Sequence, residues 1–242
     1  NRRRFLKTAA GTAGFLAAMP CLNAAEVFTD TKPLKVGLVG CGGRGLGAMK
    51  NALDADPGTM VWALADVFQE RIDFGAKLLA EQYGNRAQLD RSRLFSGLDS
   101  YKRLLQTDID VVLLCTPPAF RPEHLAAAID ASKHIYAEKP VAVDVPGVLS
   151  VLESARLAKL KNLVILDGFC WRYDKANEEA HRKLSSGLLG RVLSFDGLYY
   201  TTPPKSPLAL DSRPSSDTDV AWALRNWTAW NWLSGGQFVE QI

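Results

Sequence analysis

A glycine-rich turn is the first segment of this chain whose residue types and spacing could do chemistry. Its residues follow the pattern G-x-G-x-x-G after an apolar run at 34–39, and they are Gly40, Gly42, Gly43, Arg44 and Gly45. In such a turn the first glycine allows the tight bend, the second lets a diphosphate approach the backbone, and the third lets helix and strand pack closely. The N–H groups at the start of the following helix attract phosphate charge, and Arg44 could add a cation. The motif therefore predicts a dinucleotide-binding turn.

An acidic residue stands where such a turn requires one. Asp66 ends the apolar run VWALAD, 21 residues after Gly45. A carboxylate at this position accepts hydrogen bonds from the adenosine ribose and favours NAD over NADP. Arg71 could pair with the 2′-phosphate of NADP, so NADP stays open. The alternative is that the glycine turn and Asp66 have only a structural role, at the ends of strands.

Two further segments follow apolar runs typical of parallel strands. They are Thr116-Pro117-Pro118 after DVVLLC, and Glu138-Lys139-Pro140 after the run at 134–137. Proline biases the preceding Lys139 toward an extended backbone, which can project the lysine into a crevice. Its ammonium could then stabilise negative charge on a substrate oxygen during hydride transfer. From spacing alone, an exposed Lys-Pro turn explains these residues equally well, and His124 by itself is best interpreted as a packed or capping histidine.

The elements that must position these residues alternate between apolar runs and amphipathic stretches, which predicts a doubly wound parallel sheet of the Rossmann type. We expect strands at 34–39, 59–65, 93–95, 110–115, 134–137 and 163–167. We expect helices at 42–53, 69–82, 99–106, 122–131 and 145–159. The nucleotide-binding domain should therefore cover 34–168.

The pattern changes after Gly168, where we place the start of an incomplete α+β substrate domain at 169–242. A helix is expected at 174–186, and the alternating aromatic run at 190–201 predicts a strand of an open, mostly antiparallel sheet. A long loop at 202–217 and a tryptophan-rich stretch at 220–233 follow. Four residues of that stretch could line a sugar cleft, although their helical spacing favours core or oligomer packing: Asn226, Trp227, Trp230 and Trp232.

The first 25 residues are typical of a targeting segment. Paired arginines, Arg2 and Arg3, precede Phe-Leu-Lys, a weakly apolar stretch follows, and small residues stand at 24–25 before a linker at 26–33. This segment resembles a twin-arginine (Tat) signal and predicts passage through the Tat translocase to the periplasm; a disordered basic tail is the alternative. Tat export carries folded proteins, so a cofactor loaded before export would have to be held tightly. The stretch at 8–19 is shorter than the ~20 residues that span a bilayer.

Charge and cysteine usage exclude two classes of site. Without the four basic residues of 1–25, the chain has 25 basic and 26 acidic residues, which gives no electrostatic basis for nucleic-acid binding. The cysteines are widely spaced, so neither a metal site nor a disulfide framework is expected: Cys21, Cys41, Cys115 and Cys170. The missing initiator Met and the apolar run at 238–242 lead us to expect a piece of a longer protein.

Taken together, the motifs resemble the Gfo/Idh/MocA oxidoreductases, which are named for glucose–fructose oxidoreductase and inositol dehydrogenase. The resemblance rests on the glycine turn, Thr116–Pro118, the His124 helix, Glu138–Pro140, the segment 168–173 and Gly187 with Gly190. It implies a Rossmann domain, a second domain whose large open sheet commonly mediates oligomerisation, and a homo-oligomer. It also implies that Lys139 is the active-site lysine. The cofactor-binding candidates outside the turn are Asp66, Thr116, Pro117, His124, Glu138, Trp171 and Arg172.

The resemblance leaves two points open. Many members have two basic residues where this chain has Trp171 and Arg172. The segment 235–241 resembles the part that precedes the family's catalytic histidine, so we assign no such role to His124, His134 or His181. We expect hydride transfer between a sugar or polyol hydroxyl and NAD, or NADP. The alternatives are NAD-dependent glycoside hydrolysis, through transient oxidation, elimination and re-reduction, and a non-catalytic nucleotide- or sugar-binding protein.

Overall fold

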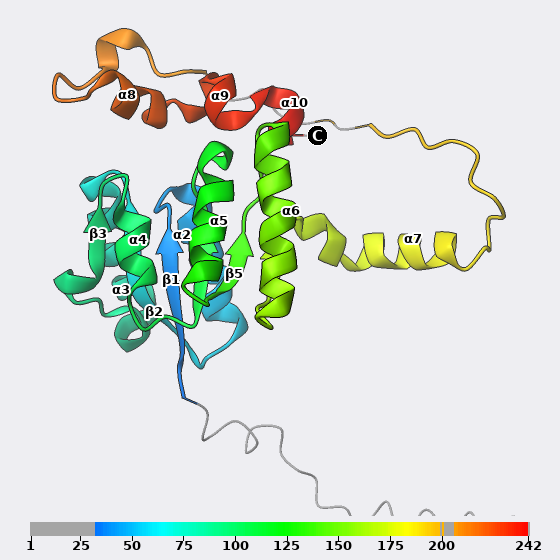
Figure 1. Cartoon of the computed structure of the whole chain (residues 1–242), viewed down its shortest axis with the longest axis horizontal. Coiled ribbons are helices and arrows are strands. Elements are labelled where there is room, and N and C mark those ends of the chain that lie inside the picture. Colours follow the sequence, from blue (N-terminus) through cyan, green and yellow to red (C-terminus); the bar gives the residue numbers. More distant parts are fainter. Residues whose placement is uncertain (1–31, 199, 201–205, 242) are drawn as a thin grey trace, which may run out of the picture. The chain divides into compact units, whose positions relative to one another are not determined.

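Six parallel strands form the centre of the molecule in the order β3-β2-β1-β4-β5-β6 (Figure 1). The computed structural model describes residues 32–198, 200 and 206–241. The predicted Tat segment at 1–25 lies outside the described residues. The strand order is that of a doubly wound dinucleotide-binding sheet, which confirms the predicted fold class.

The strands coincide closely with the apolar runs of the sequence. They are β1 (Leu34–Val39), β2 (Thr59–Asp66), β3 (Leu94–Ser96), β4 (Val111–Leu114), β5 (His134–Ala137) and β6 (Ile165–Asp167). The buried parts of the central strands are mostly apolar because helices cover both faces of the sheet. In the middle, Leu38 pairs with Leu64 of β2 and Leu113 of β4, and all three are buried.

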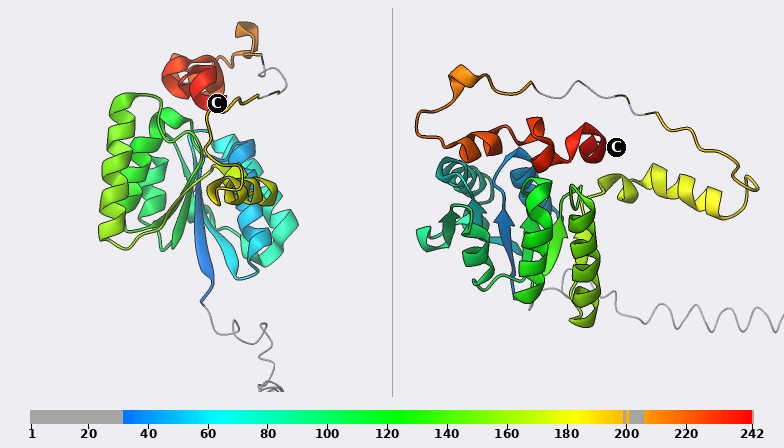
Figure 2. Two further views of the ribbon diagram at one scale, coloured as in Figure 1. Left: turned by 90° about the vertical axis from the view of Figure 1, so that its right-hand side faces the viewer. Right: turned by 45° about the horizontal axis from the view of Figure 1, so that its top comes forward.

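Helices cover the two faces in two groups (Figure 2). On one face, α2 (Gly43–Ala55) and α3 (Gln69–Tyr83) bury a cluster that includes Met49 and Leu79. On the other, α4 (Ser100–Leu105), α5 (Arg121–Asp130) and α6 (Val145–Leu160) bury a cluster that includes Leu104, Ile129 and Ala158. The two apolar clusters hold the sheet rigidly, so the loops at its ends start from fixed positions.

The parallel arrangement brings functionally distinct loops to one edge of the sheet. The glycine turn follows β1, Asp66 ends β2, the Thr116 loop follows β4 and Lys139 follows β5. The strand order reverses between β1 and β4, and ligands of such sheets bind in the crevice at that reversal. The fold therefore collects at the carboxyl edge residues that are up to 99 positions apart in the chain.

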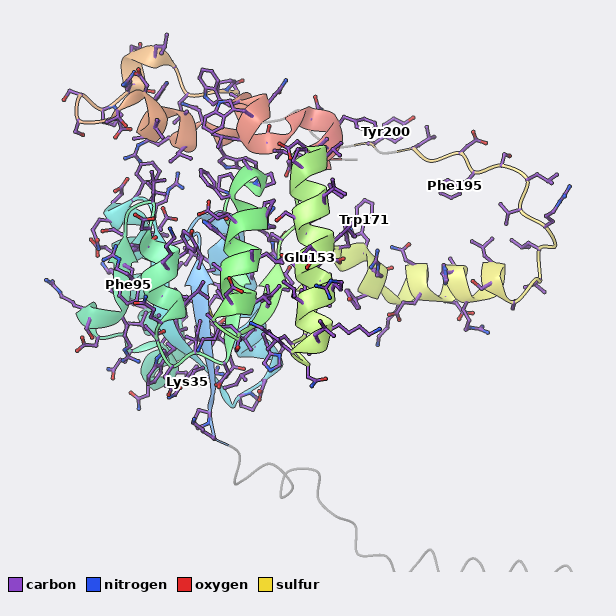
Figure 3. The ribbon with its side chains drawn as sticks, viewed as in Figure 1. Lys35, Phe95, Glu153, Trp171, Phe195 and Tyr200 are labelled. Carbon is purple, nitrogen blue, oxygen red and sulfur yellow. The ribbon has the colours of Figure 1, made fainter. Side chains whose placement is uncertain are left out.

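The chain after β6 differs from expectation. A short helical turn (Cys170–Tyr173) and α7 (Lys175–Ser185) follow, but the described residues of 190–201 contain no strand. Phe195 and Tyr200 are 86% and 89% exposed, and Phe195 lies on a segment drawn with neither helix nor strand (Figure 3). A strand needs a neighbour to pair its backbone N–H and C=O groups, and the described chain supplies none there. Alternation alone therefore gave a wrong strand prediction for these residues.

Short helices complete the described chain. They are α8 (Asp219–Arg225), α9 (Asn231–Ser234) and α10 (Gly236–Gln241), with a helical turn (Trp227–Ala229) between α8 and α9. Leu224 and Leu233 form a buried cluster with Phe68, which follows β2. The tryptophan-rich stretch thus packs on a loop at the carboxyl edge. None of the helices in the described part of the chain has the length and apolar character needed to cross a lipid bilayer.

Candidate functional site

The glycine turn leaves no room for side chains at two of its positions. Gly40 has φ +96°, and a Cβ there would lie 2.7 Å from the backbone of Cys115. A Cβ on Gly45 would lie 1.9 Å from the carbonyl oxygen of Gly40. By contrast, nothing lies within 4 Å of a Cβ built on Gly42 or Gly43. The turn is therefore closed on the strand side and open on the side where a diphosphate would approach.

The start of α2 matches that opening electrostatically. Gly42 is the N-cap and offers no side-chain cap, and the first turn of the helix contains no acidic residue. The N–H groups of a helix's first turn have no partner within the helix and carry a partial positive charge. Because the first turn of α2 contributes no carboxylate of its own, the residues present there fit a phosphate-bearing cofactor.

Most of the predicted cofactor-binding residues lie together in one cleft at this edge. Those that line it are Gly40, Gly42, Gly43, Arg44, Gly45, Asp66, Thr116, Pro117 and His124. The cleft is also lined by residues that the sequence did not single out for binding, including Val67, Phe68, Gly97, Leu98, Ser100, Tyr101, Phe120 and Leu224. Most of these follow the same strands or begin the next helix, so strand ends alone could have indicated them. Leu224 gave no such signal.

Asp66 ties two loops together at one side of the cleft. Its Oδ2 accepts a 2.7 Å hydrogen bond from the N–H of Cys41, and its Oδ1 accepts a 2.9 Å bond from the N–H of Phe68. Burial raises the pKa of this carboxyl, while the backbone donors oppose that shift. Each carboxylate oxygen can accept a second hydrogen bond. Asp66 can therefore shape the turn and accept ribose hydroxyls at once.

Arg44 is not an isolated cation beside the turn. Its Nε donates a 2.5 Å hydrogen bond to Glu138 Oε1, and its Nη2 donates a 3.1 Å bond to the Tyr136 hydroxyl. That hydroxyl donates in turn to Glu138 Oε1 at 2.7 Å, and burial followed by this bond raises the pKa of Tyr136 to about 12. Glu138 thus joins β5 to the glycine turn, and its carboxylate offsets the charge that we expected Arg44 to offer a diphosphate.

His124 is held as a neutral ring. The imidazole lies 4.0 Å from the Tyr101 ring and 5.9 Å from the Phe120 ring, measured between centroids. Its Nδ1 is 3.2 Å from the hydroxyl of Thr116. Burial lowers the pKa of His124 to about 4. This agrees with our interpretation of a packed histidine, which here also borders the cleft.

A buried arginine that the sequence did not reveal joins two loops of the site. The Arg121 side chain, at the start of α5, donates hydrogen bonds to the backbone carbonyls of Thr116 and Pro140. The residue is only 1% exposed, and its Nε has no hydrogen-bond partner. Burial lowers its pKa to about 10. The guanidinium holds the loop after β4 against the loop after β5.

Lys139 meets a carboxylate from the far end of the chain. Its Nζ donates to the backbone carbonyl of Glu240 and lies 3.2 Å from Glu240 Oε1. Glu240 belongs to α10, 101 residues later, and the sequence had not indicated it. The pair places an ammonium group and a carboxylate side by side at the exit of β5.

Other candidates lie elsewhere. Trp171 is 65% exposed on the turn after β6, and Arg172 Nη1 is 3.8 Å from Asp167 Oδ2; neither lines the cleft, so their cofactor contacts stay a prediction. Trp227 does line it, whereas Trp230 and Trp232 do not. Among the described residues, no group of His, Cys, Asp or Glu is arranged to hold a metal ion.

The comparisons with known proteins agree with this geometry. Residues 34–166, more than half of the chain, match the GFO_IDH_MocA family, described as an oxidoreductase family with an NAD-binding Rossmann fold. The chain is 28% identical over 177 residues to the dTDP-3,4-didehydro-2,6-dideoxy-alpha-D-glucose 3-reductase of Actinomadura kijaniata, covering 73% of this chain and 48% of the relative. It is 27% identical over 218 residues to glycosyl hydrolase family 109 protein 2 of Shewanella sp. (strain ANA-3), covering 82% and 46%.

Solved structures show the same fold. The crystal structure of scyllo-inositol dehydrogenase from Lactobacillus casei, with bound NAD(H) and scyllo-inositol, superposes with a TM-score of 0.54 at 23% identity. It covers 66% of this chain and 43% of that one. The chain spans about half the length of the curated relatives it matches. With its glycine turn, its strand order and its match over residues 34–166, this chain belongs to the Gfo/Idh/MocA family of oxidoreductases with an NAD-binding Rossmann fold.

Proposed function

We propose that the protein transfers a hydride between a sugar or polyol hydroxyl and NAD, with NADP as a possible substitute. The observation that carries this proposal is the Lys139–Glu240 pair at the carboxyl edge of the sheet, one strand from the loop that borders the cleft. The substrate class is supported by relatives that act on a dTDP-sugar and bind an inositol.

The cleft offers a place for each part of the dinucleotide. The open side of the turn at Gly42 and the first turn of α2 would hold the diphosphate. Asp66, at the end of β2, would accept the adenosine ribose hydroxyls. Thr116 and Pro117, after β4, lie across the switch point, where the nicotinamide half would extend toward β5.

Lys139 and Glu240, near the nicotinamide half, would each carry out one part of the oxidation of a substrate alcohol. When bound, the nicotinamide supplies the acceptor for a hydride from the substrate carbon. Lys139 would donate a hydrogen bond to the substrate oxygen and stabilise the negative charge that develops on it. The Glu240 carboxylate would take the hydroxyl proton. The substrate thus loses a hydride and a proton and leaves as a carbonyl compound.

Replacement of the lysine tests this function. We expect Lys139→Ala to bind NAD like the parent protein but to lose turnover of sugars or polyols by 100-fold or more, because typical acid–base and charge-stabilising groups contribute about 10²–10⁴ in rate. Turnover is read from the reduced-nicotinamide absorbance and binding from tryptophan fluorescence. Lys159→Ala, on the exposed side of α6, is the matched control. Full turnover by Lys139→Ala would remove the lysine from the mechanism.

A second function is supported by the Shewanella relatives. A glycosyl hydrolase family 109 protein matches 82% of this chain, and the same cofactor and lysine could serve transient oxidation, elimination and re-reduction. Release of a chromogenic aglycone without added NAD and without net cofactor reduction would favour hydrolysis. If NAD binds but neither assay shows turnover, the non-catalytic binding protein is favoured instead.

We also propose Tat-dependent export to the periplasm and assembly as a homo-oligomer. Export is supported only by the sequence of 1–25. Replacing both arginines, Arg2→Lys and Arg3→Lys, should keep the protein in the cytoplasm, which cell fractionation measures. Assembly is supported by exposed apolar side chains in and just before the segment predicted as a strand, namely Leu188, Leu189, Leu193, Phe195 and Leu198. Light scattering during size-exclusion chromatography measures the subunit number.

A further inference from the structure

One wall of the cleft comes from a part of the chain that the nucleotide-binding sheet does not contain. Leu224 of α8 and Trp227 of the following turn line the cleft together with Asp66, Phe68 and Arg71. More than 150 residues separate the two groups in sequence. The tryptophan that the sequence offered for a sugar cleft or for packing thus borders the same cleft as Asp66, and it packs against the cluster that contains Phe68.

The segment that carries this wall is fixed by both apolar and charged contacts. Leu224 is buried in a cluster with Phe68, Ala223 and Leu233. Asn226, which lies between Leu224 and Trp227 in sequence, is buried. Its side-chain oxygen accepts a 2.7 Å hydrogen bond from the N–H of Leu208. These contacts hold the backbone on each side of Trp227.

Arg225 fastens the segment to the loop after β2. Its Nη1 donates a 2.7 Å hydrogen bond to Glu70 of α3, and its Nε donates a 2.6 Å bond to Asp217. The guanidinium also lies 4.0 Å from the centre of the Phe68 ring, within the range of a cation–π contact. A single arginine therefore links α8, α3 and the ring that borders the cleft.

The chemistry of this end of the cleft suits a flat aromatic base. The cleft that Asp66 borders is also lined by the apolar or aromatic side chains of Phe68, Leu98, Tyr101 and Trp227. Of these, Trp227 packs against the cluster formed by Phe68 and Leu224. The indole of Trp227 is only partly buried, so part of its surface is available to a ligand. In a sheet of this type the adenosine half of the dinucleotide extends toward the residue at the end of β2.

We propose that Trp227 and Leu224 cover the adenine ring of the bound dinucleotide, and that Arg225 holds this cover in place. The inference rests on the proposed cofactor site and adds to it a binding surface from outside the Rossmann sheet. A base that packs on an aromatic side chain is held more tightly by roughly 5- to 100-fold, from typical alanine substitutions. A covered adenine would also slow cofactor release, as a protein exported with its cofactor would require.

Binding of cofactor fragments tests the cover directly. We expect Trp227→Ala to weaken ADP-ribose binding about tenfold and to speed NAD release in a stopped-flow displacement experiment by a similar factor, from the same stacking range. Nicotinamide mononucleotide lacks the adenine, so its affinity should not change. Trp227→Phe should restore most of the ADP-ribose affinity, because it keeps an aromatic face. Trp232→Ala, at an exposed tryptophan that does not line the cleft, is the control.

A second substitution tests the contacts of Arg225 without changing Leu224 or Trp227, which line the cleft. Arg225→Met should speed NAD release, whereas Arg156→Met, which breaks an exposed ion pair with Glu153 on α6, should not. Unchanged NAD release in both Trp227→Ala and Arg225→Met, in a parent chain that binds NAD, would overturn the cover and leave the proposed function intact. A parent chain that binds neither NAD nor ADP-ribose would overturn both. Binding that depends on Trp227 in a chain without turnover would support the cover alone.

Discussion

The buried imidazole of His124 should make the protein less stable in mild acid. Its pKa falls from about 6.5 to about 4 in the folded protein, with burial as the largest cause. The unfolded chain therefore binds a proton more readily than the folded one between these values. The stabilising difference is fully present above pH 6.5 and is lost progressively as the pH falls toward 4.

The size of this effect follows from the shift. A difference of about 2.5 pK units at ~1.4 kcal/mol per unit corresponds to roughly 3 kcal/mol of unfolding free energy. That is a large part of the 5–15 kcal/mol typical of a folded domain. Other groups titrate nearby, and the raised pKa of Asp66 acts in the opposite sense, because a carboxyl with a raised folded pKa gains stability as the pH falls.

A comparison of variants isolates the histidine from those groups. We expect His124→Gln to lose stability at pH 7, where it removes ring packing, but to lose about 3 kcal/mol less than the parent protein between pH 7 and pH 4. Urea unfolding at a series of pH values, followed by tryptophan fluorescence, gives both profiles. His181→Gln, on the exposed face of α7, should follow the parent. Parallel profiles for His124→Gln and the parent would refute the assignment of a buried neutral imidazole.

Three further substitutions test the glycine turn and the loops of the site. Gly45→Ala should weaken NAD binding at least tenfold by calorimetry, because its Cβ would lie 1.9 Å from the Gly40 carbonyl and the turn would have to shift. Gly47→Ala is the control, because the nearest atom to its Cβ is the end of the Arg44 side chain at 3.4 Å. This variant should bind NAD normally and gain about 0.5–1 kcal/mol of stability in denaturant unfolding. Equal NAD affinities of Gly45→Ala and Gly47→Ala would contradict the close packing of Gly45 against the Gly40 carbonyl. Arg121→Met should lose about 1–3 kcal/mol in the same unfolding assay, because the Thr116 and Pro140 carbonyls both lose their donor. Unchanged stability would show that the arginine does not hold these loops.

Local pattern was enough to define the nucleotide-binding sheet. Leu34–Val39 and His134–Ala137 were predicted with the bounds that the structure shows, and the other strands and helices deviate by one or two residues at most of their ends. Short runs that are apolar on both faces are typical of a covered parallel sheet, and their alternation with amphipathic helices indicates the doubly wound architecture. The glycine turn could also be predicted, because the positive φ of Gly40 and the close packing at Gly45 favour glycine at these two positions.

The strand prediction for 190–201 shows the limit of what the local sequence pattern can predict. Its alternation is typical of a strand, yet Phe195 and Tyr200 are exposed in an extended segment. Whether such a segment forms a strand depends on a partner for its backbone, and no property of its own residues supplies one.

The sequence by itself determined the fold, the glycine turn, Asp66 and the lysine at the exit of β5, because each follows from short-range spacing along a strand–turn–helix unit. Only the tertiary structure decided that Arg44 pairs with Glu138, that Glu240 meets Lys139, and that Trp227 borders the cleft. These contacts join residues between 94 and 161 positions apart. No period or motif encodes such pairs; they arise because a parallel sheet brings the ends of its strands to one edge, where later segments of the chain can pack.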